Sequence, residues 1–224
     1  MSYSLFRRVA TVLGCVLLLP GPARATAITN GGFETGTLAG WTLFTTANGT
    51  IGSPTVVSFD TTGAGASNAA RFLVGQLSFV AGDQQGGGIY QNFVTTAGEL
   101  AFYADIAAEN QTIFPNAAGG LFSMLLDGVT VASFDFGSIA VGVAERGSLS
   151  HVGLMSAGTH ELRFLITRPF LAGPPPGGTP YQYLDNVSAQ VVPEPATLLL
   201  CGAGLAGLAA RKRRWRSQQR STVV

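Results

Sequence analysis

Short runs of alternating apolar and polar residues fill the middle of the chain. They are rich in β-branched and aromatic residues and are separated by Gly, Asn and Pro, a pattern typical of strands joined by turns. The predicted strands cover residues 55–59, 70–74, 89–94, 99–107, 121–126, 129–136, 147–152, 160–168 and 183–191. Because no part of this region shows a helical 3.6-residue stripe, the pattern indicates an all-β, two-sheet antiparallel sandwich.

Turn signals support the same interpretation. Asp127-Gly128 separates two apolar runs and predicts a two-residue β-hairpin. Residues 95–98 and 156–159 predict tight turns. The stretches 110–120 and 172–180 are rich in Gly and Pro, so we expect them to form loops at the ends of the sandwich.

The two ends of the chain follow a different pattern. Near the start, Arg7 and Arg8 precede an apolar run over residues 9–19, and Ala23-Arg24-Ala25 follows. A basic segment, an apolar segment and an A-x-A site together define a secretory signal peptide. We therefore predict a signal peptide over residues 1–25, removed by signal peptidase after Ala25.

Cys15 offers an alternative to cleavage by signal peptidase after Ala25. Val12-Leu13-Gly14-Cys15 resembles a lipidation site, but Arg8 lies too close before it and the apolar run continues past Cys15. Lipidation of Cys15 remains the alternative to simple cleavage. Because Cys15 and Cys201 both lie in the terminal segments, no disulfide is expected in the central domain, predicted to span residues 26–191.

The C-terminal segment, residues 192–224, has three ordered parts. They are Pro193-Glu194-Pro195, an apolar run over residues 196–210, and the basic residues Arg211, Lys212, Arg213 and Arg214. The prolines keep the segment before the run extended. As a helix of about 15 residues the run would measure roughly 22 Å, less than the roughly 30 Å hydrocarbon core of a bilayer. The basic end is expected to stay in the cytoplasm.

This order of motif, apolar helix and basic end resembles the PEP-CTERM sorting signal of Gram-negative, exopolysaccharide-producing bacteria. The resemblance implies processing near Pro193-Glu194-Pro195 by an exosortase-type membrane protease. It also implies a transient stay in the inner membrane, through a short transmembrane sorting helix, before delivery to the cell surface, outer envelope or extracellular matrix. An ordinary tail anchor is the alternative interpretation.

Removing both terminal segments changes the charge. The full chain has a formal net charge of +1, whereas its central part holds four arginines, no lysine and eleven acidic residues. An acidic domain without a basic patch argues against nucleic-acid binding. It is compatible with divalent cations or neutral sugars as ligands.

A second resemblance lies at the two ends of the central domain. Asn30-Gly31-Gly32-Phe33-Glu34 and Tyr183-Leu184-Asp185-Asn186-Val187-Ser188 are similar to the first and last segments of galactose-binding-like jelly rolls, which include many carbohydrate-binding modules. The resemblance implies a jelly-roll sandwich. It also implies a structural Ca²⁺ that joins the ends of the domain, with Glu34 and Asp185 as side-chain ligands. The alternative is that these two side chains cap turns or face the solvent.

The sequence predicts no catalytic residue and no organic cofactor. Gly202-Ala203-Gly204-Leu205-Ala206-Gly207 has dinucleotide-binding spacing but lies in the apolar tail, with no acidic residue after it. His151 and His160 are the only histidines, and His160-Glu161 lacks the second histidine of a zinc protease. A Ser-His-Asp site stays open, because such triads assemble in space.

Aromatic residues offer surfaces for sugar rings. The jelly-roll resemblance implies that Trp41 packs in the core near the first strand, and a platform for a sugar ring is the alternative. Tyr90, Tyr103, Tyr181 and Tyr183 are candidates to present ring faces to a glycan. Because Tyr181 and Tyr183 are two positions apart, they share one face of a strand and are the proposed glycan contacts. The alternative is that both are half-buried strand residues.

These observations predict an exported, non-catalytic, single-domain protein of the cell surface or exopolysaccharide matrix, with extracellular polysaccharide as a candidate partner. Two alternatives stay open: a secreted enzyme that acts on matrix polysaccharide, and a purely structural matrix or biofilm spacer.

Overall fold

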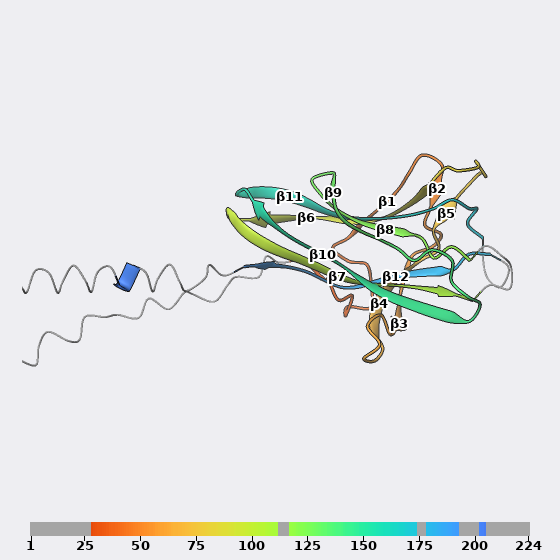
Figure 1. Ribbon diagram of the computed structural model, residues 1–224, viewed down its shortest axis with the longest axis horizontal. Coiled ribbons are helices and arrows are strands. Elements are labelled where there is room, and N and C mark those ends of the chain that lie inside the picture. The colour runs from red at the N-terminus through yellow and green to blue at the C-terminus, as the bar shows by residue number, and fades with distance from the viewer. Residues whose placement is uncertain (1–27, 112–116, 174–177, 193–201, 205–224) are drawn as a thin grey trace, which may run out of the picture.

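The computed structural model describes residues 28–111, 117–173, 178–192 and 202–204. Within them the chain forms an antiparallel sandwich of two five-stranded sheets, which Figure 1 shows as two layers. The all-β jelly-roll prediction is confirmed.

The first layer, the β7 sheet, has the strand order β10-β7-β12-β4-β3. Its strands are β3 (Thr55–Phe59), β4 (Ser67–Phe72), β7 (Gly98–Asn110), β10 (Val143–Met155) and β12 (Tyr181–Val191). The second layer, the β6 sheet, has the order β1-β6-β11-β8-β9. It comprises β1 (Thr42–Thr45), β6 (Gln85–Thr95), β8 (Leu121–Leu126), β9 (Val129–Asp135) and β11 (Gly158–Arg168). The short strands β2 (Gly49–Thr50) and β5 (Gly75–Gln76) pair with each other.

Alternation along each strand builds the core between the layers. Because successive side chains of a strand point to opposite faces, every second residue of β7 and β11 is directed inward. The buried side chains that result include Leu100, Phe102, Ile106, Leu162, Phe164 and Ile166. Burying a side chain of this size contributes roughly 1.5–3 kcal/mol, so this interface is the main source of stability.

The predicted hairpin and the core tryptophan are both confirmed. Leu126 of β8 pairs with Val129 of β9, and the intervening Asp127 and Gly128 have φ values of 50° and 81°, as a type I′ turn requires. The Trp41 side chain is buried, and its indole N–H donates to the carbonyl oxygen of Asn30 at 3.1 Å.

The two ends of the domain meet directly. The backbone N–H of Val187 in β12 donates to the carbonyl oxygen of Gly31 at 2.9 Å. A Cβ atom on Gly31 would lie 2.0 Å from the carbonyl oxygen of Val187, so only glycine fits there. The first and last segments singled out in the sequence are therefore neighbours in space.

A β-bulge shapes the middle of β12. The register between β12 and β7 shifts between Asp185 and Ser188, and Asn186 has a φ of 51°. The bulge places Val187 in the core and lets the Asn186 side chain reach β7. It therefore helps to form the site described next.

Candidate functional site: a polar hollow on the β7 sheet

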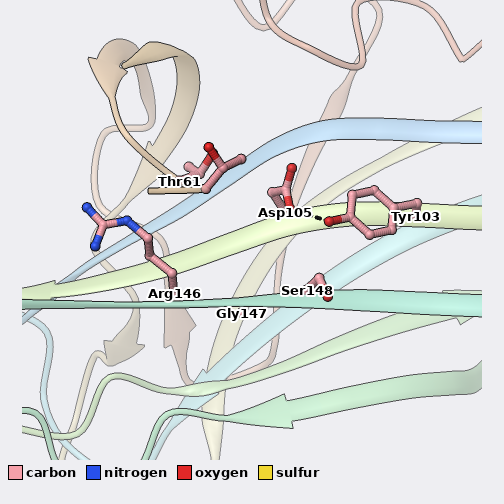
Figure 2. Close-up of a pocket in the computed structure, with 7 residues that line it drawn as sticks. Thr61, Tyr103, Asp105, Arg146, Gly147 and Ser148 are labelled. Atoms are coloured by element: carbon pink, nitrogen blue, oxygen red, sulfur yellow. Dashed lines mark hydrogen bonds between the residues drawn. The ribbon is translucent and has the colours of Figure 1, made fainter. Parts of the chain in front are cut away.

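An open polar hollow of about 340 Å³ lies on the outer face of the β7 sheet. Its floor comes from β7 and β10, and one wall comes from the loop that joins β3 to β4 (residues 60–66, the β3–β4 loop), as Figure 2 shows. The lining residues are Thr61, Thr62, Tyr103, Asp105, Arg146, Gly147 and Ser148.

Alternation along β7 directs Tyr103 and Asp105 outward, since the residues between and beside them face the core. The Tyr103 hydroxyl donates to Asp105 Oδ1 at 2.5 Å, and the Asn186 amide donates to Asp105 Oδ2 at 2.9 Å. The bond to Asp105, together with burial and the charge of that carboxylate, raises the pKa of Tyr103. Asp105 is only 8% exposed, whereas 40% of Tyr103 is exposed. The hollow thus combines an accessible ring with a fixed carboxylate.

A second carboxyl group lies beside Asp105. Asp185 is its cross-strand partner in the β7–β12 pair and is fully buried. Asp185 Oδ2 accepts from the hydroxyls of Ser67 at 2.6 Å and Thr61 at 3.3 Å, and Oδ1 accepts from the Asn186 backbone N–H at 2.6 Å. Burial, reinforced by the neighbouring Asp105, raises the pKa of Asp185 despite these donors.

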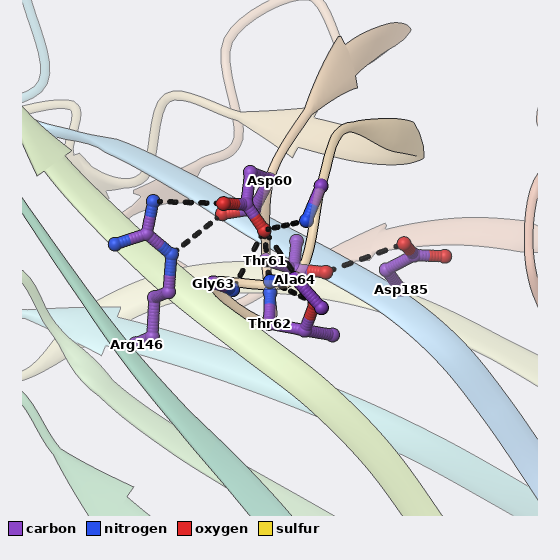
Figure 3. Close-up of polar contacts among 8 residues, drawn as sticks. Asp60, Thr61, Thr62, Gly63, Ala64, Arg146 and Asp185 are labelled. Carbon is purple, nitrogen blue, oxygen red and sulfur yellow. Dashed lines mark hydrogen bonds and ion pairs between the residues drawn. The ribbon is translucent and has the colours of Figure 1, made fainter.

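The β3–β4 loop extends over the outer face of the β7 sheet. It starts at β3 on one edge of the sheet and is held by Arg146 of β10, the strand at the other edge, as Figure 3 shows. Asp60 Oδ1 accepts from the backbone N–H groups of Thr62, Gly63 and Gly65 at 3.2, 2.6 and 3.3 Å. From β10, the Arg146 Nε donates to the Asp60 carbonyl at 2.8 Å, and its Nη2 lies 3.5 Å from Asp60 Oδ2. Desolvation opposes ionisation of Asp60, but these N–H groups and Arg146 outweigh it and lower its pKa.

The tyrosines proposed as glycan contacts lie farther along the same face. Tyr181 and Tyr183 do share a face, with ring centroids 6.4 Å apart. Tyr183 is only 3% exposed, and Phe59 stacks on its ring at 3.6 Å, so Tyr183 offers no free face to a sugar. Tyr181 is partly exposed, with the Arg71 guanidinium 4.6 Å from its ring centroid. As a glycan contact, Tyr181 stays a prediction.

Both proposed calcium ligands contact the start of β4, through adjacent residues. Glu34 is exposed and accepts from the Asn68 amide at 3.2 Å, while Asp185 accepts from the adjacent Ser67. Across residues 28–111, 117–173 and 178–192, no group of three or more His, Cys, Asp or Glu side chains is placed to hold a metal ion. Calcium here would therefore need carbonyl and water oxygens beyond two carboxylates, and its presence stays a prediction.

A Ser-His-Asp arrangement does form, at the turns remote from the hollow. His160 Nδ1 lies 2.7 Å from Asp127 Oδ2, and His160 Nε2 lies 3.4 Å from Ser156 Oγ. The same Nε2 lies 3.0 Å from the Ser156 carbonyl oxygen, which favours an N–H at this position rather than a lone pair that could act as a base. The bond to Asp127, partly opposed by burial, raises the pKa of His160. We therefore interpret these contacts as structural: His160 connects the turn that contains Asp127 with the turn that contains Ser156.

The predicted signal peptide, its cleavage at Ala25 and Pro193-Glu194-Pro195 lie outside the described residues. So does nearly all of the predicted sorting helix, of which only residues 202–204 are described, as helix. Among the described residues, no helix has the length and apolar character needed to span a membrane.

Comparison with known proteins identifies the C-terminal segment. Residues 191–214 match the PEP-CTERM protein-sorting motif, a match that includes Pro193, Glu194, Pro195 and the basic residues 211–214. The predicted sorting motif is confirmed, and it indicates an exported, cell-envelope-associated protein. No curated protein matches the chain.

Solved structures similar to the chain are distant. TmCBM61 in complex with β-1,4-galactotriose is 12% identical, covering 75% of this chain and 99% of that one, with a TM-score of 0.47. The C-terminal family 22 carbohydrate-binding module of Clostridium thermocellum Xyn10B is 15% identical, covering 74% and 97%, with a TM-score of 0.41. The K3 cleaved adhesin domain of Lys-gingipain from Porphyromonas gingivalis is 14% identical, covering 73% and 98%, with a TM-score of 0.41.

The sequence predicts only part of this site. Tyr103 is one of the four candidate tyrosines, whereas Asp105, Ser148, Arg146 and the β3–β4 loop are not predicted as site residues. The alternation over residues 99–107 already placed Tyr103 and Asp105 on one face. It could not show which other strands border that face.

Proposed function

We propose that the protein is a non-catalytic, polysaccharide-binding component of the cell surface or extracellular matrix, delivered there after processing by an exosortase-type protease. The observation that carries the binding proposal is the 40% exposed Tyr103 ring beside the hydrogen-bonded carboxylate of Asp105, in an open polar hollow. An aromatic face with fixed polar groups next to it suits a sugar ring, which has both C–H faces and hydroxyl groups.

The surrounding hydroxyl groups support this proposal. Thr61, Thr62 and Ser148 line the same hollow and can both donate to and accept from sugar hydroxyls. Because the hollow is open and lies on a sheet face, it suits one unit of a long chain. The sorting motif supports the proposed location, because it indicates an exported, cell-envelope-associated protein.

The proposal is tested by affinity electrophoresis of the mature protein in gels that contain the exopolysaccharide of the producing bacterium. We expect retardation, with a dissociation constant in the micromolar-to-millimolar range, roughly −4 to −8 kcal/mol. Tyr103→Ala should weaken binding by about 0.5–1.5 kcal/mol through loss of stacking. Tyr181→Ala should have a smaller effect, because Arg71 already lies against that ring.

Tyr90→Ala is the matched control. Tyr90 is on β6 in the other layer, where the Arg163 guanidinium lies 5.1 Å from its ring centroid. Equal losses for Tyr90→Ala and Tyr103→Ala would contradict the assignment to the hollow. Release of reducing ends from the polysaccharide would favour an enzyme, and absence of any binding would favour a structural spacer.

A further inference from the structure

The hollow contains a negative charge that no cation of the described residues neutralises. Asp105 accepts hydrogen bonds from the Tyr103 hydroxyl and the Asn186 amide, which are both neutral donors. A nearly buried carboxylate held only by neutral donors loses much of its hydration without gaining a counter-charge. Asp185 beside it is likewise held by hydroxyl and amide groups.

The basic side chains of the described residues already have other partners. The described residues include no lysine and four arginines. Three of these have acidic or aromatic partners: Arg146 pairs with Asp60, Arg163 with Glu161, and Arg71 lies over Tyr181. Arg168 is buried and donates to the carbonyls of Val74 and Ala118. The hollow's one lining arginine, Arg146, is therefore already paired with Asp60 of the β3–β4 loop (Figure 3).

We propose that the hollow binds an amino sugar with a free primary ammonium group, which Asp105 receives as counter-ion. This rests on the proposed function and specifies its ligand class. The Tyr103 and Asn186 bonds hold the carboxylate in position before the ligand arrives, so little ordering is needed on binding. A carboxylated sugar would instead meet two carboxyl groups and an arginine that is already paired.

A matched pair of ligands tests this proposal without changing the protein. At a pH below the pKa of the sugar amine, glucosamine oligomers and N-acetylglucosamine oligomers of equal length differ in whether the nitrogen carries a charge. By isothermal titration of the mature protein at low salt, we expect the free-amine oligomer to bind more tightly by on the order of tenfold, since charge-assisted bonds are the stronger ones. The preference should shrink as salt is added. Equal affinities, or tighter binding of the acetylated oligomer, would overturn the proposal.

Two variants separate the hollow from general attraction of a polycation to an acidic protein. Asp105→Asn and Glu145→Gln each remove one negative charge, and Glu145 is an exposed residue of β10 outside the hollow lining. Asp105→Asn should abolish the preference for the free amine, whereas Glu145→Gln should preserve it. Equal effects of the two variants would contradict a specific site. Circular dichroism melting of Asp105→Asn verifies its fold, and the ligand comparison stands without that variant.

The two proposals fail in different ways. Binding of neutral glycans that depends on Tyr103 but shows no preference for the free amine would overturn only the amino-sugar assignment. Absence of binding to either oligomer and to the exopolysaccharide would overturn the proposed function as well.

Discussion

At the residue scale, two buried carboxyl groups, those of Asp105 and Asp185, are the main polar feature of the outer face of the β7 sheet. Asp105 and Asp185 lie on the outward face of a sheet, where side chains normally meet water, yet both are buried. Burying a carboxylate is costly unless donors surround it, and here hydroxyl and amide donors take that role. These donors hold both carboxyl groups in fixed positions, which favours ligand binding at the hollow.

His160 gives a pH-dependent prediction at this scale. Because its pKa is raised in the folded protein, its pairing with Asp127 stabilises the fold fully below the unfolded-state pKa of about 6.5 and is lost as the pH rises through the folded-state pKa. We expect the free energy of unfolding of the wild type, relative to His160→Gln, to be larger at pH 6 than at pH 8. Urea denaturation at both values measures it.

His151→Gln serves as the control for this prediction, because His151 lies on β10 away from Asp127. It shows what the loss of an imidazole that does not contact Asp127 does to stability at each pH. A His160→Gln difference that is flat with pH would show that the contact with Asp127 contributes nothing to stability.

At the scale of elements, the β3–β4 loop is the part that completes the hollow. Its conformation depends on the Asp60 carboxylate, which accepts three backbone N–H groups, and on Arg146 from β10. Asp60→Ala should therefore expose the amides of Gly63 and Gly65 to faster hydrogen exchange while strand amides stay protected. It should also weaken glycan binding, because Thr61 and Thr62 would lose their positions.

Asp135→Ala is a matched control for the loop variant. Asp135 also accepts a backbone N–H in a turn, from Gly137 at 2.9 Å, but on the β6 sheet. It should leave the exchange of Gly63 and Gly65 unchanged.

Because the pKa of Asp60 is lowered, the order of the loop should persist to mildly acidic pH and be lost as the pH falls through that pKa. Unchanged exchange in Asp60→Ala would contradict this role.

The strands were largely predictable from the sequence, while the site was not. Residues 55–59 and 121–126 form β3 and β8 with the predicted bounds, because alternation and clear turn residues delimit them. The short strands β1, β2 and β5 were missed; β2 and β5 have two residues each, and their conformation depends on the partner strand. β10 begins earlier than predicted, at Val143, since it pairs with β7 as far as Asn110.

The order of the strands in the β7 sheet explains why the site could not be predicted from the sequence. Asp105 and Asp185 become neighbours only because β7 pairs with β12, and Arg146 joins them because β10 pairs with the other edge of β7. Local patterns indicate which face a residue takes but not which distant strand lies beside it. The burial of Tyr183 by Phe59 has the same origin, since Phe59 lies on β3, two strands away in the sheet.

At the scale of the whole molecule, the sorting tail gives a direct prediction. We expect the mature cell-surface form to lack the residues that follow the Pro193-Glu194-Pro195 region, because the match to the sorting motif includes a basic end typical of a processed signal. Intact-mass analysis of the surface form measures this. A mass that still includes Trp215 would contradict it, and replacing Pro193-Glu194-Pro195 by alanines should retain the tail.

The second prediction for the whole molecule is that a bound Ca²⁺ stabilises the domain. An ion held by Glu34 and Asp185 would join the first and last segments, which already meet through Gly31 and Val187. Because a ligand of the folded state raises stability by mass action, EDTA should lower the melting temperature, and Ca²⁺ should restore it. Glu34→Ala should lose this response. If EDTA and Glu34→Ala both leave the melting temperature unchanged, the two ends are held by protein contacts alone.

The most direct test of the central claim, that the hollow binds glycan, is a ¹⁵N chemical-shift titration of the mature protein with oligosaccharides released from the exopolysaccharide. We expect the largest shifts to cluster at Thr61, Thr62, Tyr103, Asp105 and Ser148, with a smaller effect near Tyr181 and none on the outer face of the β6 sheet. Shifts centred on Tyr90 and Arg163, or no saturable shifts at all, would contradict it.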